Sequence, residues 1–176
     1  MGEQPVDAVD VLTAQHAHIA TLLDAAAGAS GAVRASAFAD LVRLIAIHET
    51  VEAQVIHPLA RHTIDGGEAI VDARLAEEAI IKMALAELDA LDCDDVAFDA
   101  QLSGVRHIVL AHNAAEEADE FRPLRSAVPV DILREHVLSI RRAEVATPSV
   151  TGMPAPPAPD PADVIFARVR DVLRPR

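Results

Sequence analysis

Aromatic residues are scarce in this sequence. Tryptophan and tyrosine are absent, and the 176 residues include only four phenylalanines. Because 51% of the residues are nevertheless hydrophobic, the core must be built from alanine, leucine, isoleucine and valine, a mixture suited to closely packed helices. The length is that of one domain with a single core. The composition therefore predicts an all-α helical bundle.

Cysteine is almost as rare, because Cys93 is the only one in the chain. A single cysteine excludes an intramolecular disulfide, a zinc knuckle and a cysteine-ligated cluster within one chain. Cys93 lies among aspartates in Leu91-Asp92-Cys93-Asp94-Asp95, and neighbouring negative charge raises the pKa of a thiol. The sequence therefore indicates an unreactive cysteine.

Basic residues are outnumbered, and the formal net charge is -13. Nucleic acids and anionic membranes are bound through basic patches, which the scattered arginines do not supply. No signal-peptide pattern opens the sequence, and no apolar run approaches the ~20 residues of a membrane span. We therefore expect a cytoplasmic protein that binds neither nucleic acid nor membrane; the sequence leaves open whether it forms a homo-oligomer.

Apolar residues recur at helical spacing in four long segments, as in Val9, Leu12 and Ile19 of the first. The segments cover about residues 6–27, 33–62, 67–91 and 96–124. Their connections are short, which is typical of an up-down-up-down four-helix bundle, here expected over residues 6–127. Pro58 should kink or loosen the end of the second helix, because proline lacks a backbone donor.

The remainder of the chain divides into three parts. Residues 128–146 predict an additional helix, which should run from about Val130 to Ala146. Residues 147–161 are rich in proline and predict an extended linker. Residues 162–174 carry apolar residues at helical spacing and predict a C-terminal amphipathic helix.

Two His-x-x-x-Glu motifs, His48 to Glu52 and His112 to Glu116, lie 64 residues apart in the second and fourth predicted helices. A spacing of four places both side chains on one face of a helix. A single pair of this kind is commonly an exposed ion pair. Here, however, His16 on the first helix and an acidic pair on the third lie at a similar depth, and bundle cores build dinuclear metal sites in this way.

These residues resemble the pattern of the hemerythrin-like, or HHE cation-binding, family. The family pattern is a histidine on helix one, a His-x-x-x-Glu motif followed by proline on helices two and four, and a histidine on helix three. The sequence supplies His16, the motif at His48 followed by Pro58, and the motif at His112 followed by Pro123. The resemblance covers roughly Val9 to Leu124 and implies a hemerythrin-like four-helix bundle.

The resemblance implies a non-haem di-iron centre, although manganese could occupy the same ligands. The implied metal ligands are His16, His48, Glu52, Glu78, His112 and Glu116. Glu52 and Glu116 are candidates for carboxylates that bridge the two ions. Glu78 stands where the family has a histidine, in Glu77-Glu78-Ala79-Ile80-Ile81-Lys82, and the sequence leaves open which of the two glutamates faces inward.

Three further residues have expected places around this centre. Glu49 could supply another oxygen ligand, and both Glu49 and Glu117 are candidate catalytic residues that move protons. His57 is interpreted as a packing group or an outer partner of the site rather than as a ligand.

Three functions are compatible with this interpretation. The favoured one is catalase- or peroxidase-like oxidoreductase chemistry on hydrogen peroxide or dioxygen, because the carboxylate on helix three adds negative charge that stabilises ferric iron. The alternative is a module that binds or senses iron, dioxygen or nitric oxide without turnover. A third is an interaction protein that has lost its metal, for which the missing histidine on helix three is the best argument.

Overall fold

The computed structural model describes residues 6–146, and all regular structure in this range is helical, as the composition predicts. The predicted linker at 147–161 and the predicted helix at 162–174 lie outside the described residues. The elements are α1 (Ala8–Gly28), α2 (Gly31–Val51), η1 (Glu52–Ile56), α3 (His57–Thr63), α4 (Gly67–Asp89), α5 (Val96–Glu116), η2 (Glu117–Phe121), α6 (Arg122–Ala127), α7 (Val130–Glu135) and α8 (Val137–Ala146). Within this range, no helix combines the length and the apolar character that crossing a bilayer requires.

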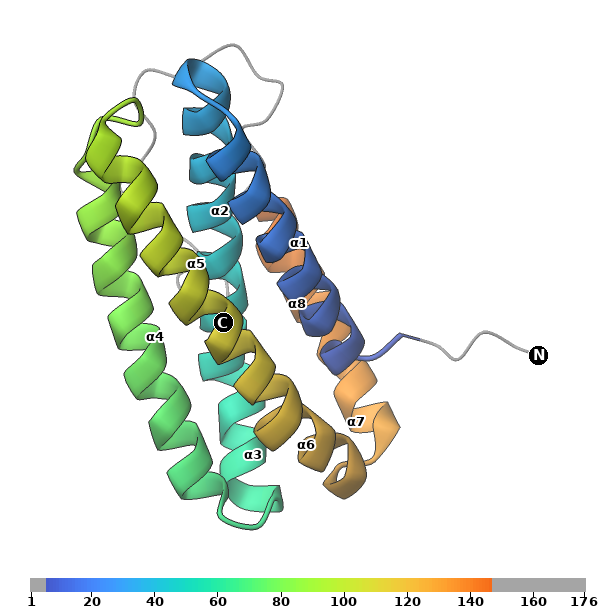
Figure 1. The fold of residues 1–176 in the computed structure, drawn as a ribbon. Helices are drawn as coiled ribbons and strands as arrows, with labels where there is room; N and C mark the ends of the chain where they lie inside the picture. The colour runs from blue at the N-terminus through green and yellow to red at the C-terminus, as the bar shows by residue number, and fades with distance from the viewer. Residues whose placement is uncertain (1–5, 147–176) are drawn as a thin grey trace.

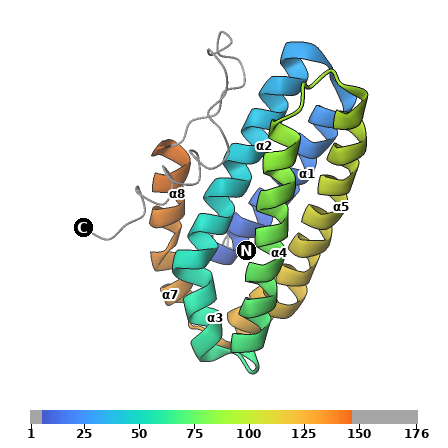
Figure 2. The ribbon, with the colours of Figure 1, turned by 90° about the vertical axis from the view of Figure 1, so that its left-hand side faces the viewer.

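Four long rods make up the body of the molecule: α1, α2 continued by α3, α4, and α5 continued by α6 (Figure 1). Consecutive rods run in opposite directions along the bundle (Figure 1). The shorter helices α7 and α8 lie outside these rods, and α8 packs beside α1 and α2 (Figure 2). The segment expected to form one helix after the bundle is therefore two, separated at His136.

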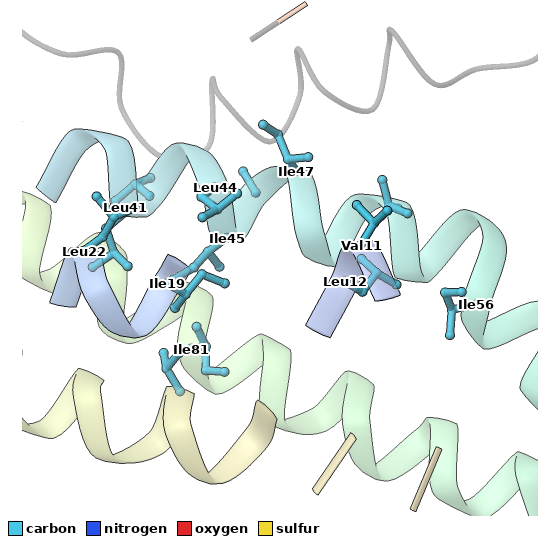
Figure 3. Packing of buried hydrophobic residues seen from close by; sticks show 14 of the residues in the cluster. Val11, Leu12, Ile19, Leu22, Leu41, Leu44, Ile45, Ile47, Ile56 and Ile81 are labelled. Carbon is cyan, nitrogen blue, oxygen red and sulfur yellow. The ribbon is translucent and has the colours of Figure 1, made fainter. Parts of the chain in front are cut away.

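The rods pack through aliphatic side chains. Ile19 of α1 and Ile45 of α2 meet near Ile81 of α4, and all three are buried (Figure 3). Phenylalanine fills the end near the α2 start, where the rings of Phe38 and Phe98 meet edge to face at 5.5 Å. Burial of each aliphatic side chain stabilises the folded state by about 1.5 to 3 kcal/mol. This apolar packing holds the four rods at fixed depth relative to one another.

Carboxylates fix where the helices begin. The Asp7 side chain accepts a hydrogen bond from the backbone N–H of Asp10, and the Asp10 side chain accepts one from the backbone N–H of Asp7, each at 3.0 Å. This reciprocal capping box satisfies backbone donors that the first turn of α1 leaves unpaired. Arg125 of α6 forms ion pairs with both aspartates. The start of α1 is thereby joined to the end of the fourth rod.

A single π-helical turn follows each His-x-x-x-Glu motif. These turns are η1 and η2, and each is followed by a proline, Pro58 or Pro123, within the first two positions of the next α-helix. Proline has no backbone N–H, so the carbonyl that would accept its hydrogen bond can accept from a later residue. The result is the wider i→i+5 turn, which inserts one residue into each rod without ending it.

Gly67, the first residue of α4, is a site of close backbone approach. A Cβ added there would lie 2.2 Å from the carbonyl oxygen of Ala60. We expect Gly67→Ala to lower the free energy of unfolding by about 1 to 3 kcal/mol, because the backbone of α3 must shift to make room. Thermal or urea unfolding measures this change.

Gly104 provides the matched control, because it lies exposed in α5 and an added Cβ meets nothing within 4 Å. Gly104→Ala should stabilise the protein by about 0.5 to 1 kcal/mol through helix propensity. Equal effects of the two substitutions would contradict the close contact between α3 and α4.

Candidate metal centre

Polar side chains from all four rods meet inside the bundle. Each is at least 95% removed from solvent. They are His16 of α1, His48 of α2, Glu52 of η1, His57 of α3, Glu78 of α4, His112 and Glu116 of α5, and Glu120 of η2. The six predicted ligands are all in this set. The structure adds His57 and Glu120 to them.

The first group of potential ligands consists of His16, His48, Glu52 and Glu116. One ligand atom from each lies within 4.8 Å of the others. The Nε2 atom of His48 is 3.2 Å from Oε1 of Glu52, and Nε2 of His16 is 3.2 Å from Oε2 of Glu116. Ligand atoms about 2.1 Å from one ion lie about 3 to 4 Å apart. The group therefore has the dimensions of a coordination sphere.

The second group consists of Glu52, His57 and Glu78, again with ligand atoms within 4.8 Å of one another. Nε2 of His57 is 2.8 Å from Oε1 of Glu78. Glu52 belongs to both groups. A carboxylate shared by two adjacent coordination spheres is the arrangement of a dinuclear site.

His112 falls in neither group, but it approaches the centre through Glu116. Its Nε2 atom is 3.0 Å from Oε1 of Glu116, while Oε2 of the same carboxylate faces His16 and His48 at 3.2 and 3.7 Å. The two oxygens of Glu116 thus face histidines from different rods. This gives Glu116, like Glu52, a central place between ligands.

All four histidines of the centre point Nε2 inward, and the Nδ1 atom of each contacts an acceptor on the side away from the centre. His16 contacts Glu117 at 2.8 Å, His57 contacts Glu120 at 2.9 Å, and His112 contacts Glu77 at 2.8 Å, all through Nδ1. Nδ1 of His48 instead contacts the side-chain oxygen of Gln15 at 3.0 Å. Outer acceptors of this kind fix the tautomer and orientation of metal-binding histidines.

The inner atoms fit a bound cation better than they fit one another. Nε2 of His16 and Nε2 of His48 are only 2.9 Å apart. Because a neutral ring with a proton on Nδ1 has a lone pair on Nε2, two lone pairs face each other there. Neither carboxylate oxygen of Glu52 has a hydrogen-bond partner among residues 6–146. Buried polar atoms without a hydrogen-bond partner destabilise the folded state unless a bound ion or another group pairs with them.

The electrostatics show the same surplus of negative charge. Burial, followed by the nearby charge of Glu116, raises the pKa of Glu52 well above its usual range. Burial also opposes ionisation of Glu116, but the surrounding imidazoles of His112, His16 and His48 outweigh it and lower its pKa. Burial disfavours a charged His57, yet hydrogen bonds to Glu120 and Glu78 raise its pKa to about 10. Cations are therefore strongly favoured at this place.

The structure separates the two glutamates of α4. Glu78 is 1% exposed and faces the centre, and its Oε2 atom is 3.1 Å from Nζ of Lys82. Glu77 is 38% exposed and contacts the outer nitrogen of His112. Glu78 thus faces inward, a choice that the sequence left open, and Glu77 contacts the ring of His112.

Glu49 and Glu117 lie at the edge of the centre and belong to neither potential ligand group. Glu49 is buried, with Oε2 at 3.1 Å from Nζ of Lys82. Its pKa is raised to about 7 by burial, against the opposing charge of Lys82. Glu117 is 44% exposed and contacts His16 through Oε1. Glu117 therefore adjoins His16, and Glu49 follows His48 directly in α2.

The sequence interpretation took His57 as a packing group or an outer partner of the site rather than a ligand. In a uniform α-helix, which turns about 100° per residue, a residue five positions after Glu52 would lie about 140° away from it. The π-helical turn η1 adds one residue and brings His57 to the face of Glu52. The same effect at η2 brings Glu120 to His57. In the sequence, the signals that could have indicated these π-helical turns are Pro58 and Pro123.

Comparison with known proteins gives one finding. Searches of curated proteins and of solved structures found no match. A model of the hemerythrin HHE cation-binding domain matches residues 7–124, a range that contains every residue of the two potential ligand groups and His112. The match covers more than half of the chain. The chain therefore belongs to the hemerythrin HHE cation-binding family.

Proposed function

We propose that this protein holds two iron ions in the bundle core and uses them to turn over hydrogen peroxide or dioxygen. The observation that carries the proposal is the 2.9 Å approach of Nε2 of His16 to Nε2 of His48, with each outer nitrogen already engaged. A cation between these atoms removes the repulsion. Sharing of Glu52 by both groups supports two ions rather than one.

The geometry supports the following set of ligands. One ion would be held by His16, His48 and oxygens of the shared carboxylates, and the other by His57, Glu78 and His112. Glu52 and Glu116 would bridge the pair, because each lies between histidines of different rods. Nitrogen and oxygen donors of this kind suit iron and also manganese.

The chemistry proposed is peroxide disproportionation. One peroxide accepts two electrons and two protons and gives two waters, while a second gives up two electrons and two protons and leaves as dioxygen. An iron pair supplies and then recovers these electrons, so no outside reductant is consumed. The carboxylates of the chain must supply and accept the protons.

A small cavity supports a small substrate. It occupies about 230 Å³ between α4 and α5 and reaches His112 and Glu77. Ile80, Ile81 and Ile108 line its walls. Peroxide, dioxygen and nitric oxide are small and uncharged, which suits a cavity of this size with isoleucine walls.

Two carboxylates are placed to move protons. Glu117 is half-exposed and contacts His16, so it connects solvent with the centre. Glu49 is buried beside Lys82, and its Oε1 atom has no hydrogen-bond partner in the described part of the chain. We assign proton transfer to these groups because they adjoin the ligands without occupying ligand positions.

Iron-loaded protein tests the function directly. We expect two iron ions per chain and release of dioxygen on addition of peroxide. Iron binding without dioxygen release would instead support a binding or sensing module. Absence of bound metal after anaerobic loading with ferrous iron would contradict the proposal altogether.

Replacing Glu49 with glutamine tests its role in proton transfer. Glu49→Gln should lower kcat for dioxygen release about 100-fold, the low end of the effect of general acid–base groups. The iron content and KM should be unchanged, because Glu49 belongs to neither potential ligand group. Exposed Glu87 on α4 gives the matched control, Glu87→Gln, which should leave kcat as it is. Equal kcat in both variants would remove Glu49 from the mechanism.

A further inference from the structure

The outer partner of His48 differs from those of the other three histidines. His16, His57 and His112 contact carboxylates, which can only accept a hydrogen bond when ionised. His48 contacts Gln15, whose side-chain amide can accept through oxygen or donate through nitrogen. An amide alone therefore does not determine which nitrogen of His48 carries the proton.

A second contact removes this ambiguity. The Nε2 atom of Gln15 donates a hydrogen bond to Oε1 of Glu144 at 2.9 Å. Because a carboxylate cannot donate, the amide nitrogen must face Glu144 and the amide oxygen must face His48. That oxygen accepts only from an N–H, so Nδ1 of His48 carries the proton and Nε2 keeps its lone pair toward the centre.

Glu144 is held in place by its own helix. It lies on α8, which Ile140 and Ala143 anchor in the core with both side chains fully buried. Arg141, on the same helix, contacts the other oxygen of Glu144 at 2.8 Å. Gln15 is only 4% exposed and the Glu144 side chain is 25% exposed, so the contact between α8 and α1 is partly buried. The helix lies beyond residues 7–124, the part of the chain that matches the family.

We propose that Glu144 is a positioning residue for the metal centre: through Gln15 it sets the tautomer of His48 and so keeps Nε2 available as a ligand. The assignment rests on the proposed metal binding at His48. It gives α8 a function, because a helix outside the bundle then controls a ligand inside it. Loss of the carboxylate frees the amide of Gln15 to turn over and lets the proton of His48 move to the inner nitrogen.

Metal affinity is the first test. In Glu144→Gln, residue 144 can donate or accept, so the direction of the Gln15 amide is no longer imposed. We expect the affinity for ferrous iron, measured anaerobically by competition with a chelator, to fall about tenfold or more, as for other outer partners of metal-binding histidines. Glu135→Gln on α7 removes the same charge from an exposed position and should leave the affinity unchanged.

A double variant that exchanges the carboxylate and the amide tests whether the lost iron affinity can be restored. In Gln15→Glu with Glu144→Gln, the carboxylate at position 15 accepts from Nδ1 of His48 and also from the amide at position 144. The variant has the same net charge as the wild type and should restore its iron affinity. Failure to restore the affinity in a folded double variant would overturn the proposal, because the direction of the hydrogen bonds would then be irrelevant.

The tautomer itself can be observed without metal. Two-bond 1H–15N correlation of the His48 ring, in metal-free protein at a pH where the ring is neutral, should show the proton on Nδ1 in the wild type and in the double variant. Glu144→Gln should show a mixture of tautomers. An unchanged tautomer in Glu144→Gln would overturn the proposal. This measurement also separates the two hypotheses, because it reports on Glu144 even if the wild type proves unable to bind iron.

Discussion

Replacing Glu52 with glutamine is expected to abolish binding of both metal ions. Glu52 is the one residue common to the two potential ligand groups among residues 6–146, and its side chain is fully buried. In the proposed centre, its loss would remove a ligand from each ion and the bridging charge between them. Because even outer partners of ligand histidines change affinity about 10- to 100-fold, we expect a reduction of more than about 100-fold. Metal analysis after anaerobic loading and gel filtration measures it.

The same substitution should leave the metal-free fold intact. Burial and repulsion from Glu116 disfavour an ionised Glu52, so removing its charge cannot destabilise the protein through electrostatics. Metal-free Glu52→Gln should therefore unfold at the same temperature as the metal-free wild type or above it. Glu87→Gln, exposed on α4, should bind metal like the wild type. A Glu52→Gln variant that retains two ions would exclude the shared carboxylate as a bridge.

Iron is expected to raise the thermal stability of the wild type considerably. A ligand that binds only the folded state, at about 1,000 times its Kd, adds about 4 kcal/mol to the free energy of unfolding. For a domain of this size each kcal/mol raises Tm by about 2 to 4 °C. We therefore expect anaerobic ferrous iron to raise Tm by about 8 to 16 °C relative to protein treated with a chelator.

Scanning calorimetry of the two forms checks this shift. The control is Glu52→Gln, in which iron should produce no comparable change. Equal Tm values for iron-loaded and chelated wild type, at iron concentrations far above the protein concentration, would show that the buried carboxylates and imidazoles are not a metal centre.

The helices could be predicted from the sequence because their signals are local. Apolar residues at helical spacing, and breaks such as Gly28 and Asp92, lie close together in the chain and give an all-helical fold. The candidate ligands on the motifs could also be identified, since a spacing of four places His48 beside Glu52 in any α-helix. The family resemblance is confirmed by the match over residues 7–124.

Other features could not be predicted, for two physical reasons. The place of His57 depends on a π-helical turn, and the pattern analysis assumed a uniform α-helix. The link from Gln15 to Glu144 joins residues 129 positions apart, and no periodicity in either helix reports such a contact. Similarly, the break at His136 between α7 and α8 follows no proline or glycine that would announce it.

The π-helical turns make the chemistry of the centre sensitive to the length of the rods. Each turn acts as a phase shift in the helical repeat, so the residues before and after it follow separate registers. Deleting one residue inside η1 would rotate the following segment by about 100° and swing His57 away from Glu52. Insertions and deletions in η1 and η2, rather than substitutions, are therefore the most direct way to change the number of potential metal-ligand atoms that face the centre.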